Sequence, residues 1–350
     1  MKKLSIKLMY FLLVALYATG SIVFSSCNKD DEETPVDLTA LASALSSANT
    51  LLSAAVEGVA DGQYQIGSKA VLQATITTVQ AIHDDPAVTQ TEADNAIVTL
   101  SQAVAAFNGK LVVPIAQDEL IAQWLFNEGS GTTANDAAST HNGTLMAGHS
   151  AIVNAGGVPT WTTDRYGVAN KALHFDMGGH IEVPFTTELN PTEMTISLWL
   201  NADVVWENNY IISQNWWLGY KLSLQSVNKV FYTANSDDGI WDRDWEVAGL
   251  PISTWIFVAV TYKAGEMNFY SNGVLVKSWT NTPGALKTIT NPEKFVIGQS
   301  EPNVPIVAPA DDPAQWGVGY FKGTLDEIRM YKKALTGTQI QSIYNLEKVE

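Results

Sequence analysis

The sequence predicts a mainly β protein: a β-sandwich of jelly-roll type that follows a small N-terminal three-helix bundle. After Asp118, short stretches of alternating apolar and polar residues are separated by turn signals, a pattern typical of sandwich strands. Residues 37–112 instead are rich in Ala, Leu, Ser and Thr and place apolar residues at helical spacing. All 11 tryptophans follow Asp118. The chain of 350 residues therefore divides into a helical part and a tryptophan-rich β part.

The first 26 residues predict a signal peptide. They contain three lysines within the first seven positions, an apolar run over residues 8–24, and two serines just before Cys27. Cys27 is the only cysteine, so the chain can form no internal disulfide. Its position resembles the box at which bacterial lipoproteins are cleaved and lipidated, and the "NKDDEE" after it resembles the acidic surface-export signal of Bacteroidota-type lipoproteins. These resemblances imply lipidation of Cys27, an acidic tether over residues 27–36, and a lipid-anchored protein on the outer membrane, at the cell surface.

The helical part predicts three amphipathic helices. Leu41, Leu45 and Leu52 fall on one face of the first helix, and similar apolar faces recur in the second and third. Thr91, with Asp94 three residues later, predicts a capping box at the start of the third helix. Helices joined by short links form antiparallel bundles. The stretch "TEADNAIVTLSQAVAAF" resembles the FIVAR-type three-helix module, which implies a spacer.

The strands of the β part are predicted from alternation. "MTISLWLNA", "YKLSLQS", "KVFYTA" and "WIFVAVTYKA" each have the length and composition of a strand. In "FYSNGVLVK", Asn272 and Gly273 stand between two alternating runs, which is the strongest short signal for a hairpin. Many short strands of this kind predict a sandwich.

Three blocks of the β part resemble laminin-G-like, concanavalin A-like lectin/glucanase domains. They are "LIAQWLFNEGSGTTANDAASTHNGTL" at the start, "STWIFVAVTYKAGEMNFYSNGVLV" in the middle and "FKGTLDEIRMYKKALTGTQIQSIY" at the end. The resemblance implies a concanavalin A-like jelly-roll sandwich over residues 118–350 that ends in a strand and a helix. Because this fold hosts lectins, glycosidases, adhesion modules and spacers, function has to be argued from particular residues.

Catalytic carboxylates are not evident in the sequence. A glycosidase needs two acidic side chains that flank the scissile bond, and glucanases with this fold carry them as Glu-x-Asp-x-x-Glu along one strand. The nearest segment, "TLDEIRM", offers Asp326 and Glu327, but adjacent strand residues point to opposite faces. The five histidines are scattered, without His-Glu-x-x-His spacing. We therefore expect no enzyme activity and assign no catalytic residue.

A structural calcium ion is implied by the same resemblance, near the meeting of the first and last strands. Calcium prefers carboxylate and carbonyl oxygens, which irregular loops supply well. The alternative is that the same side chains cap turns and pair with Arg329 or Lys322. The candidate ligands are Asn127, Glu128, Asp136 and Asp326.

Tryptophans outside the family's strand blocks are the candidates for a sugar-binding surface. Flat aromatic rings pack against the apolar face of a pyranose, and neighbouring amides, carboxylates and arginine fix its hydroxyls. Trp241, Arg243 and Trp245 share a face if their segment is a strand. Inward packing of each ring is the alternative, and one of the adjacent Trp216 and Trp217 is expected to be buried. The predicted glycan-binding residues are Trp206, Asn208, Trp216, Trp217, Tyr220, Trp241, Asp242, Arg243 and Trp245.

The acidic charge of the chain narrows its partners. At a formal net charge of -16 the chain repels a nucleic-acid backbone, so no nucleic-acid partner is expected. The signal, the fold and the loop tryptophans together predict a surface lipoprotein that captures a polysaccharide for an uptake machinery. Two alternatives stay open: an adhesion or assembly module that binds a protein, and a glycan-degrading enzyme with unfamiliar catalytic groups.

Overall fold

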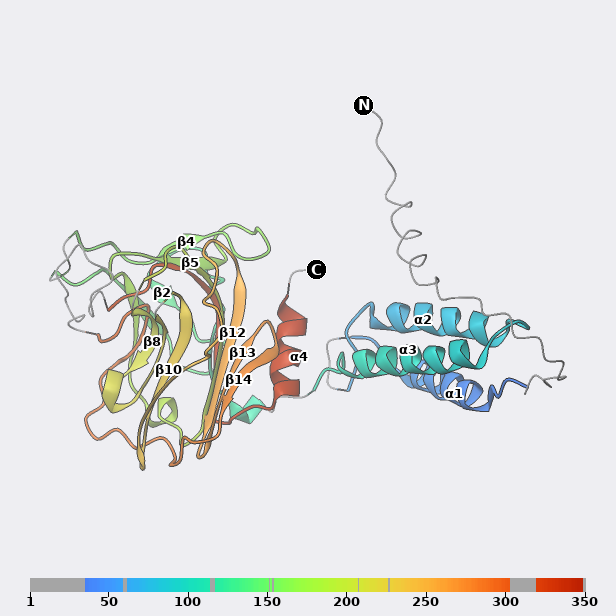
Figure 1. Ribbon diagram of the computed structural model, residues 1–350. Coiled ribbons are helices and arrows are strands. Elements are labelled where there is room, and N and C mark those ends of the chain that lie inside the picture. The colour runs from blue at the N-terminus through green and yellow to red at the C-terminus, as the bar shows by residue number, and fades with distance from the viewer. Residues whose placement is uncertain are drawn as a thin grey trace, which may run out of the picture.

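The computed structural model describes residues 35–58, 62–113, 117–150, 152, 154–206, 208–225, 227–302 and 319–348 of the chain (Figure 1). The predicted signal peptide, Cys27 and nearly all of the acidic tether lie outside these residues. Within them, no helix is long and apolar enough to cross a membrane. The described part consists of a three-helix bundle, a two-sheet sandwich and a C-terminal helix.

The helical part forms the three-helix bundle that its apolar spacing predicts. Leu41, Leu45 and Leu52 lie buried in one apolar core that the helices share. The helices are α1 (Thr39–Ala54), α2 (Ser68–His83) and α3 (Gln90–Asn108).

The cap of α3 differs from the sequence prediction by two residues. The side chain of Thr89 accepts a hydrogen bond from the backbone N–H of Glu92, and the Glu92 carboxylate accepts one from the N–H of Thr89. The predicted pair, Thr91 and Asp94, already lies inside the helix. Both threonines have an acid three positions later, so spacing alone could not distinguish the two boxes.

Two antiparallel sheets pack face to face, which confirms the predicted mainly β sandwich (Figure 1). Sheet 1 has the order β14-β13-β12-β7-β16-β5-β4, with β1 paired to β16. Its strands are β1 (Leu120–Trp124), β4 (Thr160–Thr162), β5 (Ala172–Phe175), β7 (Met194–Ala202), β12 (Ile256–Lys263), β13 (Glu266–Ser271), β14 (Val274–Trp279) and β16 (Gly323–Tyr331).

Sheet 2 has the order β11-β10-β9-β8-β15-β6-β3-β2, so β11 and β14 are edge strands of the two sheets. Asn272 and Gly273 form the turn between β13 and β14, as the hairpin signal predicts. The strands of sheet 2 are β2 (Thr133–Ala134), β3 (Gly143–Met146), β6 (His180–Val183), β8 (Asn209–Gln214), β9 (Tyr220–Gln225), β10 (Lys229–Ser236), β11 (Gly239–Asp244) and β15 (Phe295–Ile297).

Helix α4 (Gly337–Glu347) covers the outer face of sheet 1 (Figure 1). Ile340 and Ile343 of this helix pack against Trp199 and Phe257 of the sheet in a second, smaller apolar cluster. No α-helix of the described chain packs on the outer face of sheet 2. The outer face of sheet 1 is therefore covered by α4, whereas the outer face of sheet 2 is formed by its own side chains and turns.

Candidate functional site

Four polar side chains form a row across the outer face of sheet 2. Ser213 pairs with Lys221, Lys221 pairs with Thr233, and Thr233 pairs with Asp242, so the row crosses β8, β9, β10 and β11. Residues that pair directly across antiparallel strands carry their side chains on the same face. The register therefore gathers a lysine, a carboxylate and two hydroxyls from four separate strands.

A tight turn between β8 and β9, η4 (Trp216–Leu218), holds two tryptophans at this row. The backbone N–H of Trp216 donates to Ser213 Oγ at 3.2 Å, and its indole N–H donates to Tyr210 OH at 3.1 Å. The rings of Trp216 and Trp217 meet edge to face, with centroids 5.7 Å apart. Trp216 has a φ of 45°, which is unusual for a bulky residue. Backbone strain of this kind clusters at ligand sites.

Lys221 lies against the two rings. Its Nζ is 3.2 Å from the ring centroid of Trp217 and 5.4 Å from that of Trp216, a cation–π geometry. Lys221 is 0% exposed, and Nζ has no hydrogen-bond partner in the described part of the chain. Burial lowers the pKa of Lys221 from 10.5 to about 8, while the Asp242 carboxylate opposes the shift. The ammonium form, which the Asp242 carboxylate favours, attracts the indole of Trp217.

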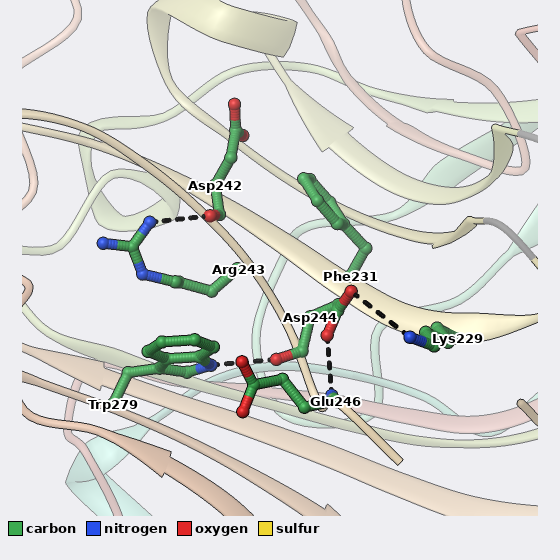
Figure 2. Close-up of a pocket in the computed structure, with 7 residues that line it drawn as sticks. All are labelled: Lys229, Phe231, Asp242, Arg243, Asp244, Glu246 and Trp279. Carbon is green, nitrogen blue, oxygen red and sulfur yellow. Dashed lines mark hydrogen bonds and ion pairs between the residues drawn. The ribbon is translucent and has the colours of Figure 1, made fainter. Parts of the chain in front are cut away.

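Asp242 joins this row to a neighbouring pocket. Burial raises the pKa of Asp242, and a hydrogen bond from Thr233 Oγ1 at 2.5 Å partly offsets that rise. The pocket has a volume of about 620 Å³ and lies beside the edge strand β11 (Figure 2). Its lining residues are Lys229, Phe231, Asp242, Arg243, Asp244, Glu246 and Trp279.

Trp279 and Arg243 form the wall of the pocket where the edges of the two sheets meet. Trp279 is the last residue of β14, and its indole N–H donates to the backbone oxygen of Asp244 in β11 at 2.8 Å. The guanidinium carbon of Arg243 is 5.1 Å from the ring centroid of Trp279 and 5.6 Å from that of Trp241. In Figure 2 the Arg243 guanidinium lies beside the Trp279 ring, while the Asp242 carboxylate points the other way.

Two acids of the pocket form ion pairs with lysines, whereas its arginine has no acidic partner within the described residues. Asp244 lies 4.0 Å from Lys229 Nζ and accepts the backbone N–H of Glu246 at 2.6 Å. Glu246 forms an ion pair with Lys277 of β14. Arg243 forms no ion pair within the described residues. One of its N–H groups donates to the preceding backbone carbonyl at 2.8 Å, and its Nε has no partner there.

Four of the nine predicted glycan-binding residues come together in this region: Trp216, Trp217, Asp242 and Arg243. Trp241 lies beside them, partly buried, and its indole N–H donates to Ser236 Oγ at 2.9 Å. The turn and the edge strand therefore bring one predicted cluster together.

Trp206 and Asn208 lie before β8, at the opposite end of that strand from η4. The ring of Trp206 lies 5.7 Å from that of Tyr320 and 5.8 Å from Lys322 Nζ. Asn208 is 9% exposed and accepts a hydrogen bond from Gln225. These two residues do not line the pocket.

Tyr220 and Trp245 are wrong as glycan-binding residues, because both are buried. Tyr220 is 0% exposed, and its hydroxyl donates to the backbone oxygen of Leu189. Trp245 is 2% exposed and belongs to the core between the sheets. It does share a side of the chain with Trp241 and Arg243, but strand pairing places that side toward the sandwich interior. At the edge of the sheet Trp241 and Arg243 are only partly buried, whereas Trp245 is fully enclosed.

Trp279, Lys229 and Lys221 were missed by the sequence reasoning. Trp279 ends the second strand of the predicted hairpin, and nothing in the sequence pattern indicates its contact with β11. Lys221 stood in a predicted strand between apolar neighbours, and its burial depends on the two tryptophans of the turn.

The four predicted calcium ligands do not form one donor set. Both carboxylate oxygens of Asp136 accept hydrogen bonds, from Gln123 N–H and Ala138 N–H at one oxygen and from His141 at the other. Asp326 instead forms an ion pair with Arg165.

The other two predicted ligands are engaged locally. Glu128 Oε1 accepts the N–H of Asn135, and the backbone oxygen of Asn127 accepts from Lys171. Within the described residues, no group of three or more His, Cys, Asp or Glu side chains could hold a metal ion. The predicted ligand set is therefore wrong as a set, and the turn-capping alternative holds for Asp136. A calcium ion held by other donors stays a prediction.

Comparison with known proteins identifies the fold. Residues 175–341 match the sequence model of the family described as the concanavalin A-like lectin/glucanases superfamily. This match and the two antiparallel sheets define a concanavalin A-like domain in this part of the chain. A search of curated proteins found no match.

Several solved structures are similar to the chain. Domain 4 of AbnA, a GH43 extracellular arabinanase from Geobacillus stearothermophilus, in complex with arabinotriose, is 21% identical with a TM-score of 0.47, over 65% of this chain and 98% of that one. The binding domain of Paraclostridial Mosquitocidal Protein 1 is 15% identical with a TM-score of 0.46, over 66% of this chain. The match spans about half, 52%, of that binding domain.

Proposed function

We propose that the chain is an exported, lipid-anchored protein of the outer membrane whose sandwich binds a glycan on the outer face of sheet 2. The binding residues are Trp216 and Trp217, with Asp242, Arg243 and Trp279 of the adjoining pocket. The observation that carries the proposal is the pair of partly exposed indoles held against a buried lysine, beside a pocket that offers both donors and acceptors.

The chemistry of this surface suits a sugar. Indole rings pack against the C–H face of a pyranose, and carboxylates, lysine and arginine hydrogen-bond hydroxyls. Each ring contributes roughly 0.5–1.5 kcal/mol beyond its area burial, so two or three rings give single-site affinities on the order of mM to μM. Weak contacts of this size become effective when many anchored copies meet one repeating polymer.

In this proposal the rest of the chain anchors the sandwich and holds it away from the membrane. In this proposal Cys27 carries the lipid, the acidic tether and the FIVAR-like bundle act as spacers, and the sandwich captures a polysaccharide at the cell surface for an uptake machinery. Supporting this are the signal-like N-terminus, the small apolar bundle core and the concanavalin A-like domain.

The test is binding of the full chain to a broad glycan panel by calorimetry, repeated with Trp217→Ala. Loss of one stacked ring is expected to weaken affinity about 5- to 30-fold, corresponding to about 1–2 kcal/mol. Trp161→Ala, on β4 of sheet 1, is the matched control and should leave affinity unchanged. A folded chain that binds no glycan would defeat the proposal.

One observation favours a second class, a glycan-degrading enzyme. Asp242 and Asp244 are two residues apart on β11, share its outer face and line the same pocket. Burial raises the pKa of Asp242, whereas Asp244 faces Lys229, and glycosidases use such unequal carboxylates as acid and base. Reducing ends released from the same panel, and lost with Asp242→Asn, would place the chain in this class.

A further inference from the structure

We propose that the pocket beside β11 selects glycans that carry a carboxylate, a uronic acid, with Arg243 as the residue that binds it. This inference rests on the proposed glycan-binding function and names the substrate class of that site. It follows from how the pocket distributes its charges.

The guanidinium of Arg243 is held in place by its neighbours, but it forms no ion pair with any described residue. The rings of Trp241 and Trp279 lie 5.6 Å and 5.1 Å from its central carbon, and one N–H is fixed by a backbone carbonyl. Its Nε–H has no hydrogen-bond partner within the described residues, although it is buried. Its terminal nitrogens still carry N–H donors that no described residue accepts, and their planar, pre-oriented arrangement matches the two oxygens of a carboxylate.

The carboxylates of the pocket cannot satisfy this arginine as they stand. Asp244 lies against Lys229 and a backbone N–H, and Glu246 pairs with Lys277 across the sheet edge. Asp242 accepts from Thr233 and points away from the guanidinium, although the charge of Arg243 still lowers the pKa of Asp242 slightly against the larger effect of burial (Figure 2). The unmet partner of Arg243 is therefore an anion supplied from outside.

The overall charge of the chain narrows the kind of anion. At a net charge of -16 the protein repels an anionic polymer, and this repulsion is smaller for a ligand with at most one anionic group per sugar than for one that carries several. Sugar hydroxyls still have acceptors in Asp242 and Asp244 and an apolar wall in Phe231 and Trp279. A glycan that contains uronic acids combines the single carboxylate with hydroxyls and C–H faces.

The experiment compares oligosaccharides that differ only at the carboxylate. Oligogalacturonate, glucuronoxylan oligosaccharides and alginate oligomers are each titrated into the full chain beside their own methyl esters, with a panel of neutral oligosaccharides alongside. At least one acid is expected to bind about tenfold or more tightly than its ester, because charge-assisted bonds exceed neutral ones in strength. Arg243→Gln should remove this preference, and Arg243→Lys, which keeps the charge but not the fork, should restore only part of it.

Lys263→Gln, at the exposed end of β12 in sheet 1, is the matched control and should leave the preference intact. Esters that bind as tightly as their acids, or a preference that survives Arg243→Gln, would overturn the inference and leave the glycan-binding function standing. Binding to neutral glycans alone would have the same consequence. If the chain bound no glycan at all, the proposed glycan-binding function itself would be wrong. Failure of the carboxylate preference can therefore be distinguished from failure of glycan binding.

Discussion

The outer faces of the two sheets both bury charged side chains, but the face of sheet 2 pairs only some of them. Under α4, on sheet 1, Arg165 pairs with Asp326, and Arg329 pairs with both Glu327 and Glu347. On sheet 2, Lys221 is fully buried without a hydrogen-bond acceptor in the described part of the chain, and Arg243 has no ion pair there. At the β6 end of sheet 2 the buried Glu182 pairs with Lys294, so the contrast with sheet 1 lies in Lys221 and Arg243, toward the β11 edge.

The network on sheet 1 has a structural purpose. Glu347 is the last residue of α4, and its carboxylate accepts from the indole N–H of Trp199 at 2.9 Å as well as from Arg329. Its backbone oxygen accepts from Arg165 Nε at 2.9 Å. These contacts attach the end of the helix to the sheet, beside the apolar packing of Ile340 and Ile343.

The contrast indicates where a ligand belongs. A buried charge without a partner is destabilising, so each one needs an explanation, and a ligand is one such explanation. Where the chain needs only stability, its buried charges are paired. Lys221, on the outer face, and Arg243, at the β11 edge, therefore indicate this end of sheet 2, rather than sheet 1, as the functional surface.

Removing Arg329 from the ion-pair network on sheet 1 is expected to change the free energy of unfolding most. Arg329→Met leaves Glu327 and Glu347 without their partner, which is expected to lower the free energy of unfolding by about 3–5 kcal/mol. Urea unfolding followed by tryptophan fluorescence measures this for the sandwich alone, because all 11 tryptophans follow Asp118. Lys332→Met, an exposed neighbour, should change the value by less than about 0.5 kcal/mol. Equal effects of the two substitutions would contradict a stabilising role for the network.

A smaller change in the free energy of unfolding is expected when Glu347 of the same network is titrated. Burial raises the pKa of Glu347 from 4.5 to about 6, so between these values the folded chain holds a proton that the unfolded chain has released. The free energy of unfolding therefore falls as the pH rises from about 4.5 to about 6. Glu347→Gln, which still offers an acceptor to Trp199, is expected to reduce the slope of the profile in this window, and the raised pKa of Asp326 accounts for slope that remains. Urea unfolding at a series of pH values checks it, and an unchanged slope would show that Glu347 ionises normally.

The fold could be predicted from the sequence because it depends on local periodicity. Alternation located the strands, Asn272 and Gly273 located a hairpin, and apolar spacing located the three helices. The error at the cap of α3 was two residues, between two threonines that have equivalent spacing to an acid. Such a boundary depends on which threonine leaves the helical conformation, and the spacing to an acid does not encode that.

The candidate site was only partly predictable, for a physical reason. Alternation shows that Trp241, Arg243 and Trp245 share a side of the chain, but not whether that side faces the other sheet or the solvent. For Tyr220 the signal was available, since its alternating neighbours Leu222 and Leu224 are apolar and buried with it. Contacts across the sheet edges, such as Trp279 with Asp244, arise only when the two sheets pack.

Removing the unpaired lysine of sheet 2 is expected to have the smallest effect on stability, and in the opposite direction. Lys221→Met keeps the unbranched side chain in the space beside Trp216 and Trp217 but removes a buried charge that has no acceptor in the described residues. Apolar replacement of a buried charge is often neutral or stabilising. We therefore expect the free energy of unfolding to be unchanged or raised by about 1 kcal/mol, in contrast to the loss for Arg329→Met.

Glycan affinity should change the other way, because the ammonium holds the indole of Trp217 by a cation–π contact that methionine does not reproduce. Unfolding and calorimetry on the same Lys221→Met preparation measure both quantities. A variant that gains or keeps stability while its affinity falls several-fold separates the functional face from the structural one, since a residue that served only packing would move both together. A variant that unfolds as easily as Arg329→Met would mean that Lys221 stabilises sheet 2 and that the difference between the two faces does not indicate function.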